Sequence, residues 1–110
     1  MYTVKKRIEI SGAHLLALPY ESPCQNLHGH NWIITVTCQA EELTDWGMVT
    51  DFRQIGEIVK RLDHANINDV MGPKHNPTAE NIARWLCEQI PCCVKVEVQE
   101  SEGNVAIYEL

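Results

Sequence analysis

The sequence predicts an α+β domain in which two helices pack on one face of a four-stranded antiparallel sheet. Polar and apolar residues alternate in four segments, and apolar residues recur at helical spacing in two segments between them. The resulting order is ββααββ. A chain of 110 residues that is 45% hydrophobic is long enough for one compact core and too short for two. We therefore expect residues 1–110 to form a single domain.

The first two predicted strands are Tyr2–Ser11 and Asn31–Ala40. In the first strand, Ile8 and Ile10 belong to an apolar phase that alternates with polar residues. In the second, every other residue from Trp32 onward is apolar. Both patterns are typical of strands that bury one face.

The two predicted helices follow in the middle of the chain. An apolar stripe runs from Asp51 to Leu62, and Asp51 and Gln54 are positioned as a capping box. The second helix begins after Thr78, its expected N-cap, and stops at Pro91, which cannot continue a helix.

The last two predicted strands are residues 93–100, "CVKVEVQE", and residues 105–110, "VAIYEL". The segment "EGN" between them has the composition of a turn. These strands complete the predicted sheet.

Three histidines share the apolar phase of the first two strands. Counting in twos from Ile10 reaches His14, and counting back from Trp32 reaches His30 and His28. If the strands form an antiparallel hairpin with residues 15–27 as its connection, the end of one strand lies beside the start of the other. The three imidazoles then converge.

Three converging imidazoles match catalytic zinc, which keeps one coordination position open for water or substrate. The alternative is that these histidines are hydrogen-bonded residues of the core. Three histidines in one place, two of them after a cysteine in a C-x3-H-x-H pattern, favour a metal site instead. Cys24 is then either a fourth ligand that closes the site or a thiol activated by the nearby charge.

Three further polar residues are candidates for the site. The phase of residues 94, 96 and 98 carries Glu100 to the core face, where a carboxylate needs a partner, although it can also turn to water at the strand end. Asp63 and His64 can form a proton-relay pair, but such residues are also common at helix ends.

Charge and composition point to a small-molecule partner. Nine basic against 15 acidic residues give a formal charge of −6 with no basic block, which argues against nucleic acid or an anionic membrane as partner. No apolar run approaches the roughly 20 residues of a membrane span, and the N-terminus lacks a signal peptide's apolar block. Five cysteines without an export signal favour reduced thiols, so we expect a cytoplasmic protein.

Six motifs, in order along the chain, resemble the 6-pyruvoyltetrahydropterin synthase family: "ISGAH", "CQNLHGHNW", "GMVTDF", "LDHANIND", "NPTAENIARW" and "VQES". The short spacing from the cysteine to His-Gly-His is most similar to the bacterial branch, the 6-carboxy-5,6,7,8-tetrahydropterin synthases of queuosine biosynthesis. The resemblance implies the tunnelling fold (T-fold), in which sheets of three subunits close a barrel and two such rings stack into a homohexamer.

The resemblance also implies roles for individual residues. Zn2+ is expected on His14, His28 and His30, with Cys24 as catalytic base, Asp63 and His64 as its partner dyad, and Glu100 as anchor of the pterin ring. Thr78 is a second candidate for substrate binding.

The implied reaction converts 7,8-dihydroneopterin triphosphate to 6-carboxy-5,6,7,8-tetrahydropterin with release of acetaldehyde and triphosphate. The alternatives are 6-pyruvoyltetrahydropterin synthase activity and a non-catalytic, zinc-stabilised pterin-binding module. Many relatives carry Lys or Arg between the cysteine and the first histidine, where this chain has the neutral Gln25 and Asn26. The triphosphate contact is therefore unassigned. Lys74 and His75, just before the second helix, are candidates, although the pattern favours ordinary surface loop residues.

Overall fold

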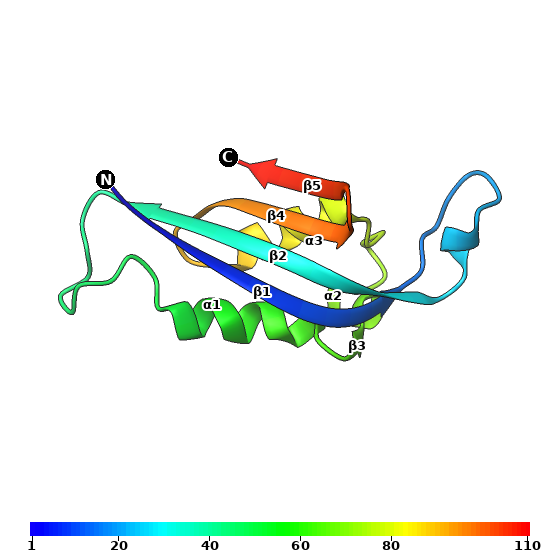
Figure 1. The fold of residues 1–110 in the computed structure, drawn as a ribbon, viewed down its shortest axis with the longest axis horizontal. Coiled ribbons are helices and arrows are strands. Elements are labelled where there is room, and N and C mark those ends of the chain that lie inside the picture. Colours follow the sequence, from blue (N-terminus) through cyan, green and yellow to red (C-terminus); the bar gives the residue numbers. More distant parts are fainter.

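A computed structural model describes residues 1–110 as a five-stranded sheet with helices on one face (Figure 1). The strands are β1 (Tyr2–His14), β2 (His28–Ala40), β3 (Ala65–Asn66), β4 (Cys93–Ser101) and β5 (Asn104–Glu109). The helices are α1 (Phe52–Val59), α2 (Ile67–Met71) and α3 (Ala79–Gln89), with 3-10 turns at Pro23–Gln25 and Lys60–Leu62. None of these helices is long and apolar enough to cross a membrane.

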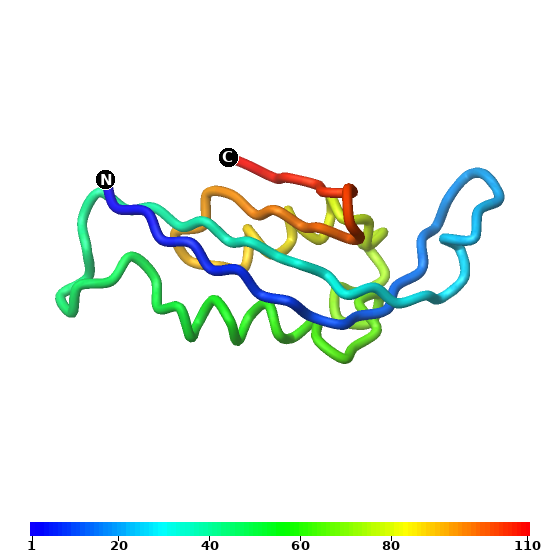
Figure 2. Tube along the Cα trace, in the orientation of Figure 1, coloured from blue at the N-terminus to red at the C-terminus, as the bar shows by residue number.

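The β1–β2 hairpin runs the length of the molecule, which measures 51 × 27 × 24 Å (Figure 2). The strands pair antiparallel without a register shift from Tyr2 opposite Ala40 to His14 opposite His28. The predicted strands stopped three residues short of this end. Residues 15–27 form the predicted connection and project beyond the sheet (Figure 2).

The core lies between the sheet and the helices, as the alternation predicted. Trp32, Ile34 and Val36 of β2 are completely buried, and they belong to one apolar cluster with buried residues of α1 and α3. The indole of Trp32 satisfies its N–H by donating a 3.1 Å hydrogen bond to the carbonyl of Gly12. The α+β prediction with helices on one face is confirmed.

The prediction of a four-stranded antiparallel sheet in the order ββααββ is wrong. The sheet is mixed, in the order β3-β1-β2-β4-β5, because the two residues of β3 pair in parallel with Gly12 and Ala13 of β1. The short helix α2 follows β3 immediately, and the side-chain oxygen of Asn66 caps it by accepting from the Asn68 amide at 3.0 Å. Two residues are too few to show a period, so the sequence pattern does not reveal this strand.

A close backbone approach at Gly12 accompanies the added strand. A Cβ atom at residue 12 would lie 2.9 Å from the Leu62 carbonyl oxygen and 3.0 Å from Cδ1 of Ile67. The segment that leads into β3 can therefore lie against β1 only because residue 12 lacks a side chain.

Candidate metal centre

Three imidazoles meet at the end of the β1–β2 hairpin that carries the long connection. His14 ends β1, and His28 and His30 stand at the start of β2, with His28 directly opposite His14. Their ring centroids lie 4.6 to 5.3 Å apart. Trp32 packs edge-on against His14 and His30, at 4.9 and 5.1 Å, so the ring positions are supported from the core.

Backbone carbonyl groups orient two of the three rings. Nδ1 of His14 lies 2.7 Å from the oxygen of Pro77, and Nδ1 of His28 lies 2.7 Å from the oxygen of Asn26. A carbonyl oxygen can only accept, so both Nδ1 atoms carry the proton and both Nε2 lone pairs are free for a ligand. Sequence reasoning missed Pro77, which is 63 residues from His14 and shows no local signal.

The pKa of His14 is lowered, chiefly because burial disfavours the charged ring. The hydrogen bond to Pro77 opposes this shift, and the neighbouring imidazoles of His28 and His30 add to it. The neutral form is the one that binds metal ions.

Glu100 of β4 is the fourth member of the cluster. Its Oε1 lies 3.4 Å from Nε2 of both His14 and His30, and the ligand atoms of all four residues lie within 4.8 Å of one another. Nε2 of His14 and of His30 are buried and have no hydrogen-bond partner. Buried nitrogen atoms of this kind are rare unless something binds them, and imidazole with carboxylate is a donor set that zinc accepts. These residues therefore fit a metal ion.

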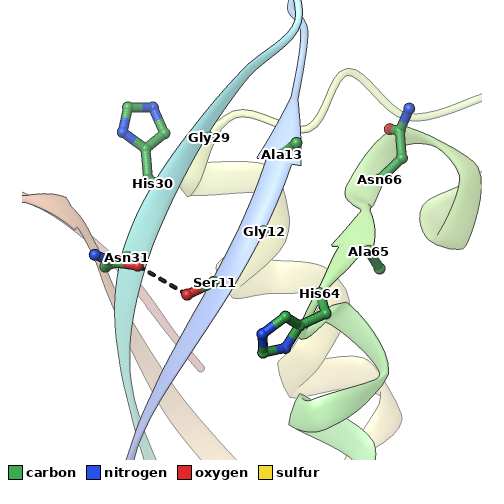
Figure 3. Close-up of a pocket in the computed structure, with 9 residues that line it drawn as sticks. All are labelled: Ser11, Gly12, Ala13, Gly29, His30, Asn31, His64, Ala65 and Asn66. Carbon is green, nitrogen blue, oxygen red and sulfur yellow. Dashed lines mark hydrogen bonds between the residues drawn. The ribbon is translucent and has the colours of Figure 1, made fainter.

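His64, the neighbour of Asp63, lines a hollow of about 490 Å³ between β1, β2 and β3, which His30 of the metal cluster also lines. Figure 3 shows His64 on the β3 side of this hollow and His30 on the β2 side. Oδ1 of Asp63 accepts a 2.9 Å hydrogen bond from the Ser11 amide and lies 3.1 Å from Nδ1 of His64. The Ser11 amide is the main cause, followed by His64, of the lowered pKa of Asp63. The carboxylate is thus held ionised next to an imidazole that is 82% exposed.

Cys24 and Thr78 lie outside both the metal cluster and this hollow. Cys24 is half-buried in the turn Pro23–Gln25, where its amide donates to Ser22 Oγ at 3.2 Å and its carbonyl accepts from the Leu16 amide at 2.8 Å. The Thr78 hydroxyl caps α3, as predicted, by accepting from the Asn81 amide at 3.1 Å. Their roles in catalysis and substrate binding stay predictions.

Comparisons with known proteins agree on one family. The family model described as 6-pyruvoyl tetrahydropterin synthase matches residues 3–110. The 6-carboxy-5,6,7,8-tetrahydropterin synthase of Rickettsia bellii is 31% identical over 112 residues, which cover 82% of this chain and 80% of that protein. The dihydroneopterin monophosphate aldolase of Pyrococcus furiosus is 40% identical over 70 residues, or 60% of this chain and 57% of that protein.

A solved structure shows the same fold. The 6-pyruvoyl tetrahydropterin synthase of Caenorhabditis elegans superimposes with a TM-score of 0.75 at 23% identity, covering 99% of this chain and 95% of that one. The structural likeness supports the predicted T-fold, while the five-stranded mixed sheet replaces the four strands expected.

Proposed function

The chain belongs to the 6-pyruvoyl tetrahydropterin synthase family, and from this premise we propose that it is a zinc-dependent lyase that forms 6-carboxy-5,6,7,8-tetrahydropterin. The proposed substrate is 7,8-dihydroneopterin triphosphate, and the proposed pathway is queuosine biosynthesis. The observation that carries the proposal is the pair of buried, unpartnered Nε2 atoms on His14 and His30, which converge with His28 and Glu100.

His14, His28 and His30 would hold the zinc ion. When bound, the ion would act as a Lewis acid on the side-chain hydroxyl groups of the substrate and acidify the neighbouring C–H and O–H groups. The chain's contribution is to hold the imidazoles with their Nε2 atoms unprotonated, which the carbonyl groups of Pro77 and Asn26 do for two of them.

Proton transfer is assigned to Cys24 and the Asp63–His64 pair. Cys24 as thiolate would remove a proton from the substrate side chain, and His64 would return one to the ring. Because a carboxylate can only accept, the 3.1 Å contact with Asp63 places the His64 proton on Nδ1 and leaves Nε2 to exchange a proton with the substrate. Asp63 stays ionised through its bond from the Ser11 amide.

The proposed reaction needs no external reductant. The ring is reduced while its own side chain is oxidised to the carboxylate, two carbons leave as acetaldehyde, triphosphate is eliminated, and one water molecule is consumed. Glu100 would accept two parallel hydrogen bonds from the amidine-like N–H edge of the pterin. Its carboxylate is 30% exposed, so a bound ring can reach it.

The assembly and location are part of the same proposal. We expect a homohexamer of two stacked trimeric rings in the cytoplasm, with catalytic groups contributed across subunit boundaries. The edge strand β5 and most of β1 have no further strand beside them, since β3 covers only residues 12 and 13 of β1. Such edges favour pairing with another chain.

The test is product analysis by mass spectrometry after incubation of the zinc-loaded protein with 7,8-dihydroneopterin triphosphate. We expect 6-carboxy-5,6,7,8-tetrahydropterin and an equal amount of acetaldehyde, neither of which should form with Cys24→Ala. A 6-pyruvoyl product, or binding of the substrate without any turnover, would contradict the proposal and favour one of the two alternatives.

One observation favours an aldolase as a second candidate. The Pyrococcus furiosus relative is named for dihydroneopterin monophosphate, and this chain has no Lys or Arg from residue 8 to residue 52, the span that contains all three histidines and Cys24. The same assay with dihydroneopterin monophosphate decides between them, since higher kcat/KM for the monophosphate, with carbon–carbon cleavage and no ring reduction, would identify the aldolase.

A further inference from the structure

We propose that Glu100 is a fourth metal ligand in the substrate-free protein and that it leaves the metal when a pterin ring binds. The first half of this proposal depends only on the geometry of the four side chains. The second half rests on the proposed function, because it takes a pterin as the molecule that competes for the carboxylate.

The distances around Glu100 are those of neighbouring corners of a tetrahedron. Zinc binds imidazole nitrogen and carboxylate oxygen at about 2.0–2.2 Å, and tetrahedral corners lie about 1.63 bond lengths apart, or roughly 3.3–3.6 Å. Oε1 of Glu100 lies 3.4 Å from Nε2 of His14 and 3.4 Å from Nε2 of His30. Two separate distances thus agree with one shared ion.

A hydrogen bond does not explain these contacts. Nε2 of His14 and of His30 have no hydrogen-bond partner, although the carboxylate oxygen is near both. Since Nδ1 of His14 is the protonated nitrogen, its Nε2 lone pair faces the Glu100 oxygen. Two acceptors at 3.4 Å repel each other unless a cation lies between them.

The pairing of the strands places Glu100 beside the imidazoles. β4 pairs with β2 so that Gln99 lies opposite Ile33, and Glu100 shares the inward phase of the buried residues Val96 and Val98. The carboxylate therefore extends from β4 towards the face of β2 that carries His30. Three neighbouring strands supply the four ligands.

Glu100 differs from the imidazoles in that it faces a second hollow, which none of the three histidines lines. Together with Ala79 and Glu80 at the start of α3 and with residues 103–107, it lines a space of about 390 Å³. Its side chain is 30% exposed, whereas that of His14 is 0% exposed. Rotation of one side chain can thus move the carboxylate from the metal cluster to a ring bound in the hollow.

The consequence is that substrate binding opens the metal site. A shell of three imidazoles and one carboxylate is closed, as in structural zinc sites, whereas catalysis requires a free position. If the pterin edge takes the carboxylate, the position becomes free only when a ring is bound beside it. Glu100 would then link ring recognition to metal activation.

Metal affinity tests the first half without any turnover. Zinc affinity is measured by chelator competition, and the cobalt-substituted protein is followed by its visible absorption. Loss of an outer-shell partner of a metal ligand costs about 10–100-fold in affinity, so loss of a direct ligand in Glu100→Gln should cost at least tenfold. Glu102→Gln, an exposed residue in the following turn, is the matched control and should leave both readouts unchanged.

A second variant at the same residue shows whether a loss of zinc affinity in Glu100→Gln comes from misfolding. Glu100→His replaces the carboxylate oxygen with an imidazole nitrogen, which zinc also accepts, so it should restore zinc affinity to within a few-fold of the original and keep four protein ligands around cobalt. Zinc affinity of Glu100→Gln within twofold of the original protein, with an unchanged cobalt spectrum, would overturn the ligand assignment.

Unsubstituted pterin tests the exchange, because it has the ring edge but no hydroxyl groups that could bind the metal. Pterin should shift the cobalt spectrum of the original protein towards that of Glu100→Gln and should not shift the spectrum of Glu100→His. Absence of pterin binding, or binding without a spectral shift, would overturn the exchange. Neither result depends on whether the proposed reaction occurs.

Discussion

Gly12 provides a sharp test of how the fold positions the Asp63–His64 pair. In Gly12→Ala the new Cβ would lie 2.9 Å from the Leu62 carbonyl oxygen, which belongs to the backbone and cannot rotate away, and 3.0 Å from Ile67 Cδ1. The segment that leads from Leu62 into β3 must then move away from β1. That movement would strain two hydrogen bonds, one that the Ser11 amide donates to Asp63 and one that the His64 amide donates to the Ser11 carbonyl.

The expected cost is that of inserting one methyl group into a packed site, about 1–3 kcal/mol. For a domain near 100 residues, about 1 kcal/mol lowers Tm by roughly 4–8 °C, so Gly12→Ala should melt at least about 4 °C lower. Gly29→Ala is the matched control on the neighbouring strand, because its Cβ would meet only the Gly12 carbonyl oxygen, at 3.7 Å.

Thermal unfolding followed by circular dichroism at equal protein and zinc concentrations compares the two variants, and kcat is measured on the same samples. We expect kcat to fall in Gly12→Ala and zinc content to stay near normal. Equal Tm values for the two variants, with unchanged kcat, would refute the claim that a bare Cα at residue 12 is required.

Four other predictions concern the site and the assembly. The purified protein should hold about one zinc per chain, and metal analysis of His28→Ala and His30→Ala should show that most of this zinc is lost. Full zinc content in both variants would contradict the proposed site. Cys24→Ala should abolish turnover with metal content near normal, and loss of zinc together with activity would make Cys24 a ligand. Because the folded pKa of Asp63 is lowered, its contribution to stability is present above its unfolded pKa and is lost as pH falls through the folded value. Asp63→Asn should therefore be less stable than the original protein at pH 7 and approach it below about pH 4, and a gap independent of pH would contradict this. Light scattering at micromolar concentration should give a hexamer, and a fully active single chain would refute the barrel.

The sequence predicted the parts of the fold that a local period controls. Alternation in β1 and β2 placed Trp32 in the core and brought His14, His28 and His30 to one phase, and the hairpin then brought them together. The sequence pattern did not predict residues 65–71, where pairing with β1 holds β3 and the Asn66 cap stabilises α2. Those interactions depend on segments that are distant in the sequence or on too few residues to form a pattern.

The sequence also predicted only part of the site. Phase on β4 carried Glu100 to the correct face, but phase alone could not show that its carboxylate would lie 3.4 Å from two imidazoles. The resemblance assigned Glu100 to the pterin ring, which is one of two roles that its position allows. The carbonyl of Pro77 that orients His14 could not be predicted, since it depends on how the loop before α3 lies against β1.

The site residues differ in how firmly the fold holds them, and this difference bears on function. Neighbouring strands hold the three imidazoles, with Trp32 packed against two of them, so the fold brings these rings together before anything binds. Cys24 and His64 lie on a turn and on a segment after a 3-10 helix, and His64 is 82% exposed. Catalytic groups are effective only when they are held in place, and within its own chain the exposed His64 ring is held by the 3.1 Å contact with Asp63 alone. The proposed subunit boundary would supply the missing support, because burial of His64 against a neighbouring chain would fix its ring without any change in the metal cluster.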